Sequence, residues 1–250
     1  MLTPVLKKYI KSLHDKRNRL EEWRFLVEWW KPLIELLQSN HPIEYLFVTE
    51  WFQDEYHELL EGRDFSIVSQ VEIEKAGTLQ SNNAWIAILN MFDDENDTLW
   101  DIILVLDGIN DPGNLGTIMR IADWYGITTI IASKDTVDCY NPKVIMASMG
   151  SYLRTRIQYT DIEKFLLSQK EWIIFGAYLG GKNIHTLSSD SFREKTFLVI
   201  GSEAHGIRDG IASAIHRKIT IPGFWNAESL NAWVATAVIL DNFRRLISLK

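Results

Sequence analysis

The second half of the chain alternates apolar runs of strand length with segments of helical spacing. Residues 102–108 (IILVLDG) form a continuous apolar run, and residues 114–126 (NLGTIMRIADWYG) have helical spacing and end at a glycine. The alternation continues, with strands expected at 127–133, 171–179 and 196–202 and helices at 142–151 and 227–249. Strands that alternate with helices predict a mostly parallel α/β sheet with helices on both faces.

The first half has a different pattern and predicts a smaller α/β domain. RFLVEWWKPLIELLQS (24–39) is typical of a short strand that leads into an amphipathic helix. Further strands are expected at 43–51 and 65–69, and a short helix at 71–79. The acidic, non-periodic stretch 91–100 is typical of a linker. We therefore predict two domains, residues 1–97 and 98–250.

Composition indicates a soluble globular protein, with 46% hydrophobic and 24% charged residues. The longest apolar runs are of strand length, too short to cross a bilayer. The N-terminal segment is basic and has no apolar core of the kind that signal peptides carry, so no membrane partner is expected. Cys139 is the only cysteine, which excludes an internal disulfide and a cysteine-based zinc cage. A reducing cytoplasm is the expected location.

The charge of the chain gives two opposing indications about nucleic acid. A net charge of −7 argues against such a partner, because phosphate binding depends on Lys and Arg. Residues 1–24, however, carry seven basic side chains against three acidic ones. This basic amphipathic segment is either a solvated helix face or an RNA contact, and the sequence leaves both interpretations open.

Three segments carry the candidate chemistry, and each lies where a predicted strand meets a loop. They are LDGINDPGNLGTIMRIAD (106–123), LVIGSEAHGI (198–207) and ITIPGFWNAESLNAWVATA (219–237). Open α/β sheets bind ligands at such junctions, beyond the carboxyl ends of the strands. Each segment alone also has an ordinary structural interpretation as a turn or a helix cap.

Taken together, the three segments resemble the signature motifs of the SpoU/TrmH branch of the SPOUT methyltransferases. The family patterns are roughly DPxNxGxxxRtA, lxxGxExxGl and IPmxgxxeSLNvsvA, and the match spans residues 102–246. FLVEWWK and LFVTE in the first half are similar to the RNA-binding domain that precedes the catalytic domain in many members. The resemblance implies a trefoil-knotted homodimer that transfers a methyl group from S-adenosylmethionine to a ribose 2′-hydroxyl of RNA. Ribosomal RNA is expected ahead of transfer RNA, because such N-terminal domains often accompany ribosomal targets in the family.

The resemblance also implies roles for individual residues. The backbones of Gly201, Ile221 and Leu230 match positions that hold the cofactor. The polar active-site positions are matched by Asn114, Arg120, Glu203, Ser229 and Asn231. The family's proposed base is Arg120, but a guanidinium stays protonated at neutral pH. We therefore expect Arg120 to hold the 2′-oxygen and stabilise its developing charge. No metal is expected, because the sulfonium leaves as a neutral group.

The sequence departs from the family pattern at two tryptophans. Trp29 stands where glycine usually follows VE, and Trp225 falls in the third-motif loop, close to the expected cofactor. If Trp225 points outward, as we favour, cofactor binding is expected to be normal. If it points inward, it would crowd the adenosine and weaken cofactor binding. Four tryptophans of the first half are candidates for base stacking or, as we favour, for packing: Trp23, Trp29, Trp30 and Trp85.

Two other functions are compatible with parts of the sequence. A non-catalytic RNA-binding protein could keep the same fold, although the polar motif residues are intact. An NAD-dependent enzyme is disfavoured, because no G-x-G-x-x-G stands between a strand and a helix. The sequence does not identify the RNA, the nucleotide or the proton acceptor.

Overall fold

The computed structural model describes residues 1–78, 84–92, 102–192, 195–224 and 228–247. The chain forms two compact units. Unit 1 comprises Met1–Asp93 with Asp138–Leu153, and unit 2 comprises Asp94–Val137 with Arg154–Lys250. The boundary that we predict at residue 97 lies outside the described residues. Residues 138–153, which the sequence pattern assigns to the second domain, pack with unit 1.

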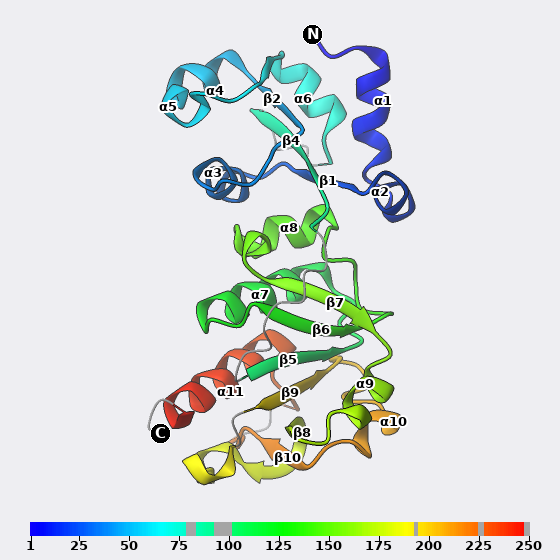
Figure 1. The fold of residues 1–250 in the computed structure, drawn as a ribbon, viewed down its shortest axis with the longest axis vertical. Helices are drawn as coiled ribbons and strands as arrows, with labels where there is room; N and C mark the ends of the chain where they lie inside the picture. Colours follow the sequence, from blue (N-terminus) through cyan, green and yellow to red (C-terminus); the bar gives the residue numbers. More distant parts are fainter. Residues whose placement is uncertain (79–83, 93–101, 193–194, 225–227, 248–250) are drawn as a thin grey trace. The chain divides into compact units, whose positions relative to one another are not determined.

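Unit 1 contains a four-stranded sheet in the order β1-β4-β2-β3 (Figure 1). Its strands are β1 (Arg24–Val27), β2 (Tyr45–Val48), β3 (Ser66–Ile67) and β4 (Trp85–Asn90). β4 pairs antiparallel with β1 and β2, whereas β2 and β3 are parallel. The short strand expected at the start of 24–39 is present as β1, and the strands expected at 43–51 and 65–69 are present but shorter.

The helices of unit 1 include two where the sequence suggests one basic helix. They are α1 (Pro4–Ser12), α2 (Lys16–Glu22), α3 (Trp30–Gln38), α4 (Glu50–Glu55), α5 (His57–Leu60), α6 (Gln70–Ala76) and α8 (Pro142–Ser148), followed by the 3₁₀ turn η1 (Ser151–Leu153). The Asp15 carboxylate accepts a hydrogen bond from the Arg17 backbone and so starts α2. Trp23, with a φ of 55°, ends α2. α4 and α5 follow β2 without a clear periodic signal in the sequence.

α8 packs within unit 1 beside β1 and α3. The aromatic residues around this helix explain its place. The Phe25 ring of β1 lies 4.7 Å from the Tyr140 ring and 5.9 Å from the Tyr152 ring, measured between centroids. The Tyr140 hydroxyl also accepts a hydrogen bond from the Phe92 backbone. Residues from the middle of the chain therefore complete the core of the N-terminal unit.

Unit 2 contains a six-stranded sheet in the order β10-β8-β9-β5-β6-β7 (Figure 1). Its strands are β5 (Ile102–Asp107), β6 (Thr129–Ser133), β7 (Arg156–Thr160), β8 (Ile173–Asn183), β9 (Thr196–Gly201) and β10 (Arg217–Thr220). Neighbouring strands pair in parallel throughout. The prediction of a mostly parallel sheet is confirmed.

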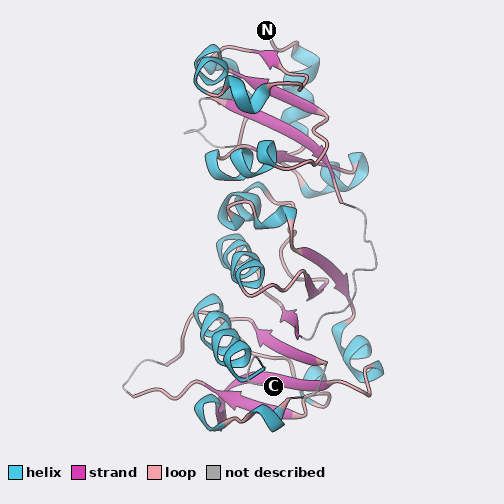
Figure 2. Cartoon of the chain, turned by 60° about the vertical axis from the view of Figure 1, so that its left-hand side comes forward, coloured by secondary structure: helices cyan, strands magenta, loops and turns pink. Residues whose placement is uncertain are grey.

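Helices cover both faces of this sheet (Figure 2). They are α7 (Pro112–Trp124), α9 (Ile162–Ser168), α10 (Asp209–Ala212) and α11 (Ala232–Ile247), with the 3₁₀ turns η2 (Ile184–Thr186) and η3 (Ser189–Ser191). Val105 and Val199 face a core that includes Ile162 of α9 and Ile211 of α10. On the other face α7 packs against α11, and Phe243 of α11 contacts Phe175 of β8. This two-sided burial explains why the strands are apolar at successive positions.

Two helix starts differ from the expectation. α7 begins at Pro112 rather than Asn114, because the Asp111 carboxylate accepts the Asn114 N–H and caps the helix. α11 begins at Ala232, whereas the sequence pattern favours a start near residue 227. Residues 228–230, placed in that helix by the pattern, precede it as an exposed segment. No helix in the described part of the chain is long and apolar enough to cross a membrane.

Candidate active site at the carboxyl edge of the parallel sheet

The first and second motif segments begin side by side, at the carboxyl ends of β5 and β9. Asp107, the last residue of β5, is the register partner of Gly201, the last residue of β9. The loop after β5 leads to α7, and the loop after β9 carries the G-x-E segment (Figure 1). Parallel strands end at a common edge, so the two motifs meet there.

The loop after β9 folds back over its own first residue. Ser202 and Gly206 form a β-bridge, and the Gly206 N–H donates to the Ser202 carbonyl over 2.9 Å. A Cβ on Gly201 would lie 2.1 Å from the Gly206 carbonyl carbon, so only glycine fits. Gly206 has a φ of 67°, in the left-handed region. This tight turn exposes Glu203 at its tip.

A short chain of side chains joins all three motifs. The Asn114 side-chain amide donates to Glu203 Oε1 over 2.5 Å. Asn231 Nδ2 lies 3.5 Å from Asn114 Oδ1, the outer limit of a hydrogen bond. Asn231 Oδ1 accepts the Trp233 N–H over 3.1 Å and so caps α11. The structure therefore brings together Glu203, Asn114 and Asn231.

Arg120 and Ser229 do not join this cluster. Both side chains are exposed, and neither makes a hydrogen bond or ion pair with the described residues. Six helical residues at about 100° each place Arg120 roughly 120° around α7 from Asn114. Its helix face is shared with Thr117 and with Trp124, whose side chain is 85% exposed. Arg120 is thus a guanidinium on the surface of unit 2 that has no partner in the described part of the chain.

The predicted cofactor positions occupy different environments around the cluster. Gly201 and Ile221 are half-buried, at the ends of β9 and β10, and Leu230 is exposed just before α11. Trp225 lies outside the described residues. Among the residues that the structure describes, no group of three or more His, Cys, Asp or Glu could hold a metal ion.

An ion-pair network beneath the loop was not anticipated. The Asp107 carboxylate is almost wholly buried and accepts from the Arg208 backbone N–H over 2.8 Å and from Arg208 Nε over 2.6 Å. The Arg208 guanidinium also lies 3.3 Å from Asp135. Hydrogen bonding to Asp107 raises the pKa of Arg208, and hydrogen bonding to Ser133, aided by Arg208, lowers the pKa of Asp135. One feature of the sequence could have indicated this network: Asp107 ends β5, which is otherwise apolar.

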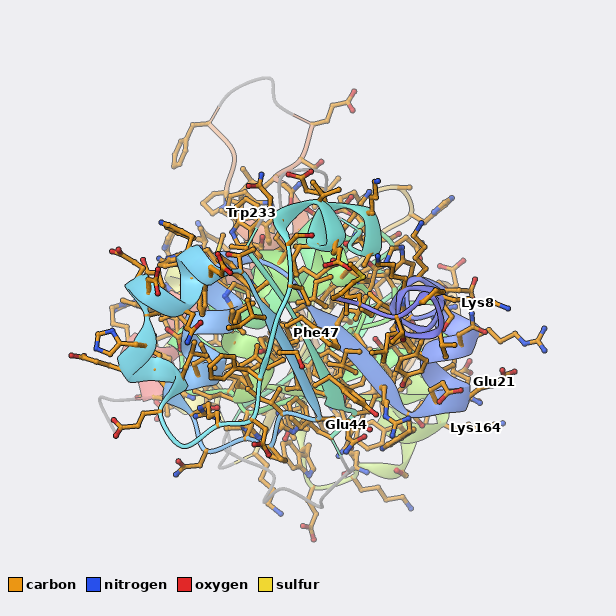
Figure 3. The ribbon with its side chains drawn as sticks, turned by 90° about the horizontal axis from the view of Figure 1, so that it is seen from above. Lys8, Glu21, Glu44, Phe47, Lys164 and Trp233 are labelled. Atoms are coloured by element: carbon orange, nitrogen blue, oxygen red, sulfur yellow. The ribbon has the colours of Figure 1, made fainter. Side chains whose placement is uncertain are left out.

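In unit 1 the structure assigns most of the basic N-terminal side chains to internal ion pairs. Arg19 is 1% exposed and pairs with Asp138 over 2.6 Å. Lys7 pairs with Glu72, Arg17 with Glu21 and Arg24 with Glu44. The lysines left exposed are Lys8, Lys11 and Lys16. Figure 3 shows Lys8 and Glu21 on the outer side of α1 and α2.

The tryptophans of unit 1 divide between packing and exposure. Trp30 and Trp85 lie 5.3 Å apart between ring centroids, and Trp85 also packs on Phe52. Trp29 is half-buried with a φ of −105°, so the glycine of the family pattern is not required there. Trp23 remains 48% exposed, and Trp51, which the sequence did not single out, is 57% exposed.

Solved structures share this fold across nearly the whole chain. A putative RNA methyltransferase of the TrmH family from Porphyromonas gingivalis has a TM-score of 0.85 and 28% identity, with 98% of this chain and 99% of that chain covered. An AdoMet-bound rRNA methyltransferase from Sinorhizobium meliloti has a TM-score of 0.82 and 26% identity, with 98% and 96% covered. The fold is that of the SpoU/TrmH RNA methyltransferases.

Family profiles cover both halves. The SpoU rRNA Methylase family matches residues 101–241, and an MRM3-like substrate binding domain matches residues 7–87. The chain therefore belongs to the SpoU rRNA methylase family. It is 25% identical over 241 residues to the 23S rRNA (guanosine(2553)-2'-O)-methyltransferase RlmP of Bacillus subtilis, with 94% of each chain covered. It is 27% identical to an uncharacterized tRNA/rRNA methyltransferase of Synechocystis, with 96% and 90% covered.

Proposed function

We propose that the protein transfers a methyl group from S-adenosylmethionine to a ribose 2′-hydroxyl of RNA. In this proposal unit 2 catalyses the transfer and unit 1 recognises the RNA. The observation that carries it is the convergence of Glu203, Asn114 and Asn231, one residue from each motif, at the carboxyl edge of the sheet. The substrate is RNA rather than DNA because only RNA has the 2′-hydroxyl.

The residues at this edge suit the proposed cofactor. S-adenosylmethionine supplies the methyl group and carries a positive sulfonium. The exposed Glu203 carboxylate is complementary to that charge, and the half-buried backbones of Gly201 and Ile221 offer hydrogen-bonding groups. Leu230, 48% exposed, offers both backbone and apolar surface. The AdoMet in the related Sinorhizobium structure supports this assignment.

The side chains would divide the remaining work. The exposed Arg120 guanidinium holds the 2′-oxygen and stabilises the negative charge that develops on it. An RNA phosphate or solvent accepts the proton. Asn114 positions the ribose and is itself held by Glu203. Asn231 and Ser229 brace the segment that leads into α11.

Ribosomal RNA is the proposed substrate class. The Bacillus subtilis relative, similar along 94% of its length, is described as acting on 23S rRNA. The match of unit 1 to a substrate-binding domain supports a recognition role for it. Transfer RNA is the second candidate, in keeping with the tRNA/rRNA description of the Synechocystis relative.

We further propose a twofold homodimer built on unit 2, with the trefoil knot that the family resemblance implies. Large apolar side chains remain exposed on and beside α7 and α11. They are Trp124 (85%), Leu230 (48%) and Trp233 (38%). A second copy would cover such a surface and lie close to the exposed Arg120. Light scattering at micromolar concentration is expected to give a dimer, and a monomer would contradict this part of the proposal.

The activity is tested with labelled S-adenosylmethionine and ribosomal or transfer RNA. Label is expected in dinucleotides that resist alkali, because a 2′-O-methyl group blocks cleavage of the adjacent phosphodiester. Label confined to base-methylated nucleosides would refute the ribose assignment. Binding of RNA without binding of S-adenosylmethionine would instead identify a non-catalytic RNA-binding protein.

A further inference from the structure

We propose that Asp107 and Arg208 form a clasp that positions the cofactor-binding loop, residues 201–208. Neither residue needs to touch the methyl group, so both are positioning residues. The inference rests on the proposed function, because it assumes that this loop holds S-adenosylmethionine.

Asp107 contacts both ends of the loop. The backbone of Asp107 pairs with Gly201, where the loop begins. The carboxylate of the same Asp107 binds the backbone N–H and the guanidinium of Arg208, where the loop ends. The loop between them is already compact, because Gly206 lies against Gly201. Asp107 therefore fixes the position of the loop relative to β5.

The burial of Asp107 makes this contact strong. The Asp107 side chain has 0% exposure, whereas the Arg208 side chain is 51% exposed. A buried carboxylate that loses its cationic partner is left uncompensated in a poorly solvated site. Asp135 is 55% exposed and can be solvated without Arg208, so its contact is secondary. Loss of Arg208 thus favours water entry and displacement of the loop end.

Displacement of the loop would disturb the cofactor site and leave RNA recognition unaffected. The loop carries Gly201 and Glu203, and Glu203 holds Asn114 across the gap between motifs. The expected consequence is weaker binding of S-adenosylmethionine. RNA recognition by unit 1 does not depend on this contact.

The test compares Arg208→Gln with Arg208→Lys in the full chain, with calorimetric binding of S-adenosylmethionine as the readout. Arg208→Gln is expected to raise the Kd at least tenfold, while Arg208→Lys, which keeps a cation beside Asp107, is expected to restore part of the loss. Arg154→Gln is the matched control, because Arg154 is a similarly exposed arginine that pairs with Asp123 elsewhere in unit 2. The KM for S-adenosylmethionine is expected to rise in parallel, with RNA affinity changed less than twofold.

Asp107→Asn provides a second route, with a folded state verified by circular dichroism before binding is measured. If the native protein binds S-adenosylmethionine and Arg208→Gln binds it equally well, the clasp is refuted. A loss of RNA affinity with unchanged cofactor affinity would refute it too, and would make Arg208 an RNA contact. Failure of the native protein to bind S-adenosylmethionine would refute the proposed function instead.

Discussion

In unit 1 three of the six basic side chains of α1 and α2 have carboxylate partners, whereas in unit 2 Arg120 has none among the described residues. Arg19 is the clearest contrast, because its guanidinium is buried between Asp138 and the carbonyls of Leu13 and His14. Both arginines look equally available in the sequence. As far as the described residues show, Arg120 can meet a phosphate or a ribose without first breaking a contact of the fold, whereas Arg19 cannot.

The contrast separates the charge that a segment carries from the charge that it can offer to a ligand. A desolvated arginine with several acceptors contributes to the order of the core around it. An exposed arginine without a partner contributes little to the stability of the fold. The two kinds of residue should therefore respond oppositely when stability and activity are both measured.

The largest effect is expected for Arg19→Met, which leaves the buried Asp138 without its partner. Removal of one member of a buried pair costs about 3–5 kcal/mol of the free energy of unfolding. Urea denaturation measures this change. Arg17→Met is the control, because its pair with Glu21 is exposed and worth under about 1 kcal/mol. Equal losses in the two variants would contradict the structural role of Arg19.

Arg120→Ala should show the opposite response, with stability retained and turnover lowered about 100-fold, the usual scale for loss of one preorganised charge stabiliser. Steady-state methylation assays and calorimetric cofactor binding measure the two quantities, and the affinity for S-adenosylmethionine is expected to stay the same. Arg245→Ala removes another exposed arginine of unit 2 as a control. Normal turnover in Arg120→Ala would remove this residue from the mechanism.

A smaller effect is expected from the exposed lysines of α1 and α2, which are Lys8, Lys11 and Lys16. Each phosphate contact contributes about one unit to the salt dependence of binding. The triple alanine variant should therefore bind RNA with a salt slope reduced by up to about 3. Lys164→Ala, on α9 of unit 2, is the comparison. An unchanged slope in the triple variant would show that α1 and α2 present only a solvated face.

The smallest effect concerns Glu72. Hydrogen bonding to Lys7, then to Ser69, lowers its pKa from 4.5 to about 2. The carboxylate therefore stabilises the fold above pH 4.5, and this contribution is lost as pH falls toward 2. Glu72→Gln should flatten the acid limb of a stability-against-pH curve. Burial raises the pKa of Glu28, so this carboxyl group costs stability as the pH rises and it ionises. Glu28→Gln should therefore remove a loss of stability toward higher pH, whereas Glu72→Gln removes a loss toward lower pH.

The sequence was informative where a single segment determines its own structure. The strands β5, β6, β8 and β9 follow from their apolar runs, whereas β7 (RIQYT) has no such run and was not predicted. Asn114, Glu203 and Asn231 meet because their motifs end neighbouring strands or start neighbouring helices. Contacts between distant segments that lie outside the three motifs were not predictable. Arg19 and Asp138 stand 119 residues apart, and hydrophobic periodicity identifies neither the burial nor the partner of a charged side chain.

The placement of residues 138–153 in unit 1 has a consequence for folding during synthesis. The β-strands of unit 1 are complete once residue 90 has left the ribosome, but α8 and the partner of Arg19 are still to come. About sixty residues separate Asp93 from Leu153, which at 5–20 residues per second means a delay of about 3–12 s. During that interval Arg19 is without Asp138, and Phe25 is without the Tyr140 and Tyr152 rings that later pack on it. We expect a chaperone-accessible intermediate whose lifetime is set by translation rather than by the folding barrier.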